Sequence, residues 1–134
     1  MIFVSSCQKA PLNDNIEDFW KLVEYTTKHN QKLHKCEQIF YALQLQVIEI
    51  SERGGNLGLP RIQGLYEYNQ STNKINIRNL YYYNENTQDF STPDSLILHS
   101  FGLNDINTTF EVVSVDKRWM TLESDYAILK LKKF

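Results

Sequence analysis

The sequence predicts an all-β protein, an antiparallel meander of short strands that closes into a barrel. The chain of 134 residues is 42% hydrophobic and 13% aromatic, enough to build one core. Eight Tyr and seven Phe, against five Gly and three Pro, are typical of strands. About seven or eight segments alternate apolar and polar residues between turn-forming stretches, the pattern of successive antiparallel strands. We therefore expect one barrel domain over residues 16–134.

The charge balance excludes one class of partner. Lys and Arg number 14 and Asp and Glu 16, for a net charge of −2, and no segment gathers positive charge. Nucleic acid is not expected, because its binding requires many phosphates to be neutralised. No run approaches the roughly 20 apolar residues of a membrane-spanning helix. A monomer is the default, and the sequence leaves the oligomeric state open.

The first element is expected to start near Ile16. Residues 8–15, QKAPLNDN, have no periodicity and are interpreted as a linker. In IEDFWKLVEYTT, Asn15 suits the cap of a short helical turn, and a strand follows. Its two expected faces are Phe19, Lys21, Val23 and Tyr25, and Trp20, Leu22, Glu24 and Thr26.

The next segment, HKCEQIFYALQLQVIEISE, is long enough for a helix, but its apolar residues have a period of two. We predict one long bent strand, or two strands joined end to end. The alternating residues are Ile39, Tyr41, Leu43, Leu45 and Val47.

A hairpin follows the glycine-rich stretch RGGNLGLP, which is expected to form a turn. The segments RIQGLYEY and KINIRNLYYY alternate on either side of NQSTN. One face of the second strand should carry Ile75, Ile77, Asn79, Tyr81 and Tyr83.

Residues 84–107 form the one long irregular connection, with a short helix predicted in TPDSLILHSFG. Thr92 is expected as its N-cap, Pro93 at the first position and Gly102 near the end, and the segment suits a plug or lid. Three short strands with tight turns, in TTFEVVSV, WMTLES and DYAILKLKKF, complete the chain. Their alternating sets are Val113 and Val115, Met120 and Leu122, and Ala127, Leu129 and Leu131.

Three stretches resemble the small bacterial lipocalin-like proteins, in particular envelope lipoproteins with one lipocalin-like domain. They are PLNDNIEDFWKLVEYTT, HKCEQIFYALQLQ and FEVVSVDKRWMTLESDYAILKLKKF, and FWKL and the W-x-T-L-E ending are the most specific parts. The resemblance covers about residues 13–134 and implies an eight-stranded up-and-down barrel of the lipocalin (calycin) type. It also implies that Trp20 plugs one end of that barrel. Glu17-Asp18-Phe19-Trp20 replaces the usual Gly-x-Trp, and the resemblance implies no particular ligand.

The start of the chain, Val4-Ser5-Ser6-Cys7, resembles a lipobox, in which small residues precede the cysteine that receives lipid. Residues 1–7 are thus interpreted as the end of a lipoprotein signal peptide, with Cys7 as the attachment site. Each buried acyl CH₂ contributes about 0.8 kcal/mol, so two or three chains would anchor the domain. This predicts a bacterial envelope protein, in the outer membrane, that touches the membrane through its lipid alone. An ordinary exposed cysteine and a Cys7–Cys36 disulfide are the alternatives.

The sequence offers no catalytic constellation. It has no Gly-x-Ser-x-Gly, and His34 and Cys36, two apart on a strand, fall short of the three or four ligands of a metal site. We expect no enzyme activity, metal or cofactor.

The aromatic residues favour binding of a small apolar or amphipathic ligand inside the barrel, since a tyrosine offers an apolar ring and a hydroxyl. Simple filling of a narrow interior is the alternative role for the same residues. An interaction module, in which the 84–107 loop contacts a protein or glycan partner, is the second functional hypothesis. If the apolar residues of SLILHSFGL fold over the barrel mouth, a lid is favoured. If they project as a surface patch, contact with a partner is favoured. The candidate lining residues are Tyr41, Leu43, Leu45, Tyr66, Tyr68, Ile75, Ile77, Tyr81 and Tyr83.

Overall fold

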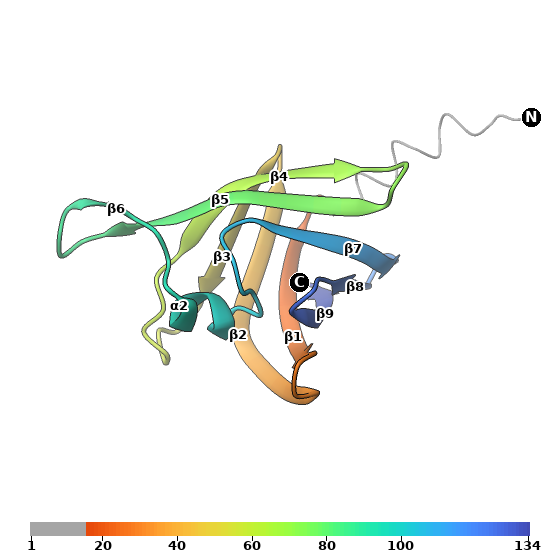
Figure 1. Cartoon of the computed structure of the whole chain (residues 1–134), viewed down its shortest axis with the longest axis horizontal. Coiled ribbons are helices and arrows are strands. Elements are labelled where there is room, and N and C mark those ends of the chain that lie inside the picture. The colour runs from red at the N-terminus through yellow and green to blue at the C-terminus, as the bar shows by residue number, and fades with distance from the viewer. Residues whose placement is uncertain (1–15) are drawn as a thin grey trace, which may run out of the picture.

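A computed structural model describes residues 16–134, which form nine strands and a short helix, α2 (Figure 1). The predicted lipobox and linker, residues 1–15, lie outside the described residues. The elements are β1 (Phe19–Thr27), β2 (Lys32–Gln44), β3 (Val47–Glu52), β4 (Ile62–Asn69), β5 (Lys74–Asn84), β6 (Asp89–Ser91), α2 (Ser95–Ser100), β7 (Thr108–Val115), β8 (Trp119–Glu123) and β9 (Ala127–Lys133).

Eight of the strands close into an antiparallel barrel, which confirms the predicted fold. Each strand pairs with the next along the chain, β5 pairs with β7 across the long connection, and β9 pairs with β1. The short β6 pairs only with the end of β5, and this hairpin extends past the barrel at the left of Figure 1. Closure leaves no unpaired edge in the eight-stranded ring.

The barrel has two distinct ends, because the connections of an up-and-down meander alternate between them. The base carries the turns 45–46, 70–73 and 116–118. The mouth carries the turns 28–31 and 124–126, the loop 53–61 and the connection 85–107 that contains α2.

At the base, the alternative of one long bent strand through Leu45 is wrong, because the chain reverses there; the segment forms two strands, β2 and β3, paired as a hairpin. Gln44 pairs with Val47, and Leu45 and Gln46 form a two-residue hairpin turn with φ of 51° and 68°. Positive φ at both positions is the geometry that matches the twist of paired strands. Beyond the turn the interior residues are Ile48 and Ile50, which shifts the alternation by one.

Register shifts in β1 and β7 also change which residues face inward. In β1 the shift lies between Leu22 and Glu24, so Tyr25 follows Trp20 and Leu22 into the core instead of sharing the face of Phe19. A β-bulge adds one residue to a strand and therefore inverts the alternation beyond it.

In β7 the register shift lies between Val112 and Ser114. Phe110 and Val112 are buried, and Val113, which was predicted to alternate inward, is half exposed. The predicted sets in β8 and β9 are confirmed, because all of their members are buried: Met120, Leu122, Ala127, Leu129 and Leu131.

A third inversion divides β5. Ile75 and Ile77 are buried as predicted, but Asn79 adopts a φ of 61° and Leu80 takes the next interior position. The pairing with β4 shifts at the same place, opposite Gly64. A Cβ on Gly64 would lie 2.8 Å from the carbonyl oxygen of Arg78, so only glycine fits this approach. Beyond the bulge, the odd-numbered tyrosines of β5 face outward.

The predicted helix is present, with a different N-cap. Asp94, not Thr92, caps α2, because its carboxylate accepts the Ile97 amide at 3.0 Å. Gly102 follows the helix with a φ of 81°, a conformation in which glycine carries no steric penalty.

Trp20 is fully buried, as expected for a plug, and its indole Nε1–H donates to the carbonyl of Ile16 at 3.0 Å. No helix within residues 16–134 has the length and apolar content to cross a membrane.

Candidate functional site

The mouth of the barrel is covered by residues 95–103, here called the lid. Leu98, Phe101 and Leu103 of the lid are 5%, 0% and 0% exposed and belong to the barrel core. Leu96, on the opposite face of α2, is 77% exposed. Three apolar residues of SLILHSFGL, namely Leu98, Phe101 and Leu103, thus pack into the barrel, as expected for a lid.

Two tyrosine hydroxyls inside the barrel hold the lid by its backbone. Tyr25 of β1 donates to the carbonyl of His99 at 2.7 Å, and Tyr41 of β2 donates to the carbonyl of Phe101 at 2.6 Å. Burial raises the pKa of Tyr25 to about 12 and the pKa of Tyr41 well above its ordinary value. Both phenols are therefore neutral hydrogen-bond donors at physiological pH.

Tyr25 was not among the predicted lining residues. Its alternation with Phe19 placed it outside, and the bulge that turns it inward leaves no sign in the hydrophobic pattern.

Six of the nine predicted lining residues lie in or against the core. Tyr41, Leu43, Ile75 and Ile77 are buried, Tyr66 is 5% exposed, and Tyr68 is partly buried. Tyr66 serves the base of the barrel, where its hydroxyl donates to Glu17 Oε2 at 3.3 Å.

The other three predicted lining residues face solvent, and for them the prediction is wrong. Leu45 is 75% exposed because it occupies the hairpin turn. Tyr81 and Tyr83 are 38% and 51% exposed because the bulge at Asn79 inverts the alternation of β5.

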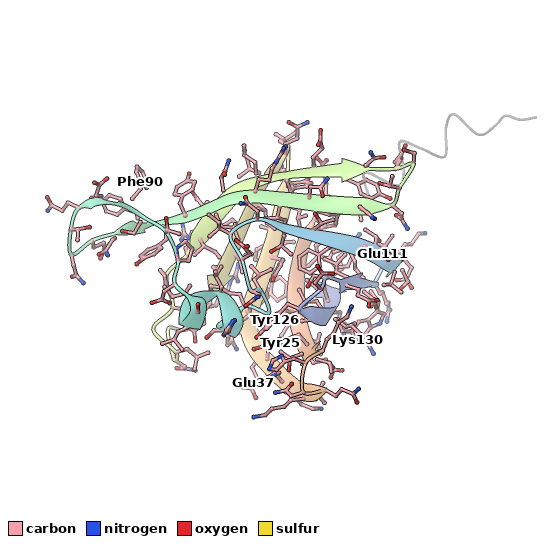
Figure 2. All side chains as sticks on the ribbon, in the orientation of Figure 1. Tyr25, Glu37, Phe90, Glu111, Tyr126 and Lys130 are labelled. Atoms are coloured by element: carbon pink, nitrogen blue, oxygen red, sulfur yellow. The ribbon has the colours of Figure 1, made fainter. Side chains whose placement is uncertain are left out.

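A concavity of about 850 Å³ lies outside the barrel, beside the lid at the mouth. Tyr126, in the β8–β9 turn, stacks on His99 of the lid with ring centroids 5.1 Å apart and on His29 at 6.1 Å. His99 Nε2 also lies 2.9 Å from Asn104 Oδ1. Figure 2 labels Tyr25 and Tyr126 at this end. These contacts attach the lid to the rim from outside.

His34 and Cys36 of β2 carry atoms that could act as nucleophiles or metal ligands, but ring contacts and burial limit the reactivity of both. The ring of His34 stacks on Tyr25 at 4.5 Å, and burial lowers its pKa. Burial raises the pKa of the Cys36 thiol to about 11, so it is protonated at neutral pH and weakly nucleophilic. Residues 16–134 contain no group of three or more His, Cys, Asp or Glu placed to hold a metal ion.

Two solved structures share this fold. A lipocalin-like protein from Bacteroides uniformis superposes with a TM-score of 0.66 at 20% identity, over 90% of this chain and 99% of that one. An uncharacterized protein from Bacteroides eggerthii gives a TM-score of 0.63 at 19% identity, over 87% of this chain and 98% of that one. At such low identity these likenesses establish the fold alone.

A search of curated proteins finds no match. The sequence model of the family described as lipocalin-like domain matches residues 1–134. The match spans the complete barrel, its lid and the N-terminal segment, and the chain therefore belongs to the lipocalin-like domain family.

Proposed function

We propose that the protein binds a small apolar or amphipathic ligand in its barrel, and that the lid must move aside to admit it. The observation that carries this proposal is the attachment of the lid through Tyr25 and Tyr41. Both hydroxyls bond carbonyl oxygens of the lid instead of groups of the barrel wall. When the lid lifts, Phe101 and Leu103 vacate an apolar space that retains two donors.

A ligand with an oxygen acceptor would replace the two lid carbonyls that accept hydrogen bonds from Tyr25 and Tyr41 in the closed state. An unpaired buried donor costs about 1–3 kcal/mol, so Tyr25 and Tyr41 favour ligands with an oxygen acceptor on an apolar body. Apart from tyrosines, the buried polar side chains of residues 16–134 are Thr27 and Ser124, and neither is a cation. A carboxylate would lose its hydration there without a compensating charge. The proposed ligand is therefore neutral, with a carbonyl, ester or amide oxygen.

A pair of fluorescent polyene lipids tests this proposal: cis-parinaric acid and its methyl ester. The full chain should bind the ester more tightly than the acid at neutral pH, and Phe101→Ala should bind both more tightly because its lid is weakened. Because Tyr41→Phe loosens the lid as well as removing a donor, its readout is a ratio: affinity for the ester should fall relative to affinity for a polyene hydrocarbon without an oxygen acceptor. Tyr83→Phe, a change at an exposed residue, should leave that ratio unchanged. If neither probe binds the full chain or Phe101→Ala, barrel binding is refuted. A preference for the acid would refute the neutral ligand.

We also propose that the domain is held at the outer membrane of a bacterial envelope by lipid on Cys7, and that it binds its ligand without catalysis. The support for the anchor is the lipobox-like Val4-Ser5-Ser6-Cys7. Expression of the natural gene in its own host with an alkyne analogue of palmitate should label the protein. Cys7→Ser should abolish labelling and Cys36→Ser should retain it. Label that persists in Cys7→Ser, or that never appears in the wild type, contradicts the anchor.

A further inference from the structure

A second concavity, here called the ribbon cleft, lies outside the barrel at its mouth end, between the β3–β4 loop and the β5–β6 hairpin, and Ile97 of the lid is part of its lining. Its volume is about 760 Å³, within the range of about 300–1,000 Å³ of small-molecule sites. The lining includes Arg61, Gln63, Tyr81, Tyr83, Asn84 and Phe90.

Three aromatic rings of the cleft are exposed to solvent. Tyr81, Tyr83 and Phe90 are 38%, 51% and 65% exposed. Phe90 lies directly across the β5–β6 pair from Tyr83 and packs edge-on against both tyrosines, with centroids 5.6 Å and 5.4 Å away. The mutual packing limits the rings to one arrangement, and a cluster of exposed aromatic surface is a mark of a binding site.

The bulge at Asn79 is what brings these rings outward. Without it, Tyr81 and Tyr83 would continue the inward alternation of Ile75 and Ile77. The barrel closes with Leu80 in the interior position instead. A strand distortion with a φ of 61° thus serves to present two tyrosines on the surface.

Side-chain amides surround the rings. The Tyr81 hydroxyl donates to Gln63 Oε1 at 3.3 Å, and Asn84 Oδ1 accepts the Asn86 backbone amide at 3.0 Å. Each primary amide carries both donors and acceptors, so Gln63, Asn84 and Asn86 can bond either end of a hydroxyl group.

The charge of the cleft excludes anionic ligands. Its one cation, Arg61, is paired through Nε with Glu49 Oε2 at 3.0 Å. Glu85 is the remaining charged residue of the lining. Phosphate, sulfate and nucleic acid require surplus positive charge, which these residues do not supply.

We propose that the ribbon cleft binds a neutral oligosaccharide. A sugar ring combines an apolar C–H face, which packs on an exposed aromatic ring, with hydroxyl groups that bond amides and phenols. In the cleft, exposed aromatic rings lie beside side-chain amides, and the lining carries no net positive charge. A protein partner is less well suited, because protein interfaces are broad patches of about 800 Å² on each side.

The exposed rings of the proposed sugar site are separate from the proposed barrel site, although Ile97 of the lid lines the cleft. Phe90 lies far from the mouth residues Tyr25 and Tyr126 in Figure 2. Tyr83 and Phe90 have no place in the core, so their truncation should leave barrel binding of the polyene ester unchanged. Failure of one proposal therefore does not imply failure of the other.

The test is a ¹H–¹⁵N NMR titration of the labelled full chain with neutral hexasaccharides of glucose, mannose, xylose and N-acetylglucosamine. Each is raised to about 5 mM, where a complex of millimolar Kd is populated. At least one should shift the amide resonances of residues 81–90. The double variant Tyr83→Ala/Phe90→Ala should raise Kd about tenfold or more, as truncation of central rings does. Phe134→Ala is the matched control, because Phe134 is 69% exposed and outside the cleft.

Three outcomes would overturn the proposal. The first is that no hexasaccharide shifts residues 81–90. The second is that Phe134→Ala weakens binding as much as the double variant does. The third is that a proline-rich peptide or a sulfated hexasaccharide, titrated in parallel, shifts residues 81–90 while the neutral sugars do not.

Discussion

The Tyr41→Phe substitution tests how the lid is held. Tyr41 is fully buried, and its hydroxyl donates to the Phe101 carbonyl at 2.6 Å. Phenylalanine keeps the ring and its packing but removes the donor, so the carbonyl loses this partner. The loss of such a buried partner costs about 1–3 kcal/mol. A Tyr83→Phe control removes a hydroxyl that is half exposed and should change stability by less than about 0.5 kcal/mol.

The lid should respond more strongly than the barrel strands. A loss of 1–3 kcal/mol raises the lid-opening equilibrium about 5- to 150-fold if the bond breaks when the lid opens. Hydrogen exchange reports this opening at the amides of Phe101, Gly102 and Leu103, which bond carbonyls within the lid at 2.9–3.0 Å and exchange when the opened lid unfolds. Their exchange should accelerate by that factor, while the slowest amides of β9 change only with the global stability.

Equal acceleration at the lid and in β9 would refute this reasoning, because the lid would then open only when the whole barrel unfolds. An unchanged lid exchange rate would refute it as well, since the hydrogen bond would then contribute nothing to closure.

Further outcomes are expected at the base, at the turn and at high pH. Trp20→Ala should lower the free energy of unfolding by about 3–5 kcal/mol in a denaturant titration, and a stable variant would argue against the plug. Leu45→Asn with Gln46→Gly should stabilise the protein by about 0.5–1 kcal/mol, since both positions have positive φ and Leu45 is 75% exposed; a loss of stability would contradict the turn geometry. The pKa of Cys36 rises from 9.0 to about 11 and that of Tyr25 from 10.0 to about 12, so the stability due to their neutral forms is complete below pH 9. That stability should be lost between pH 9 and 12 in thermal melts, and Tyr25→Phe should flatten the decline above pH 10; a decline of the same slope in that variant would contradict a Tyr25 contribution.

The hydrophobic alternation was sufficient to predict the fold class. Met120, Leu122 and Leu129 follow a period of two without interruption, and the structure buries all three. The β4–β5 hairpin was predicted because turn-forming residues separate two clear patterns. Local pattern determines these elements, since each strand buries one face against the same core.

Only the tertiary structure decided at which residues the alternation of inward and outward side chains reverses. Bulges at Leu22–Glu24 and at Asn79, and the reversal at Leu45, are imposed by the curvature and pairing of a closed barrel. They turn Tyr25 inward to the lid and Tyr81 outward to the ribbon cleft. The sequence by itself predicted strands rich in tyrosine whose rings line or fill a barrel interior. Which of them face the interior depends on register shifts of a single residue, and a one-residue shift reverses every side chain that follows it.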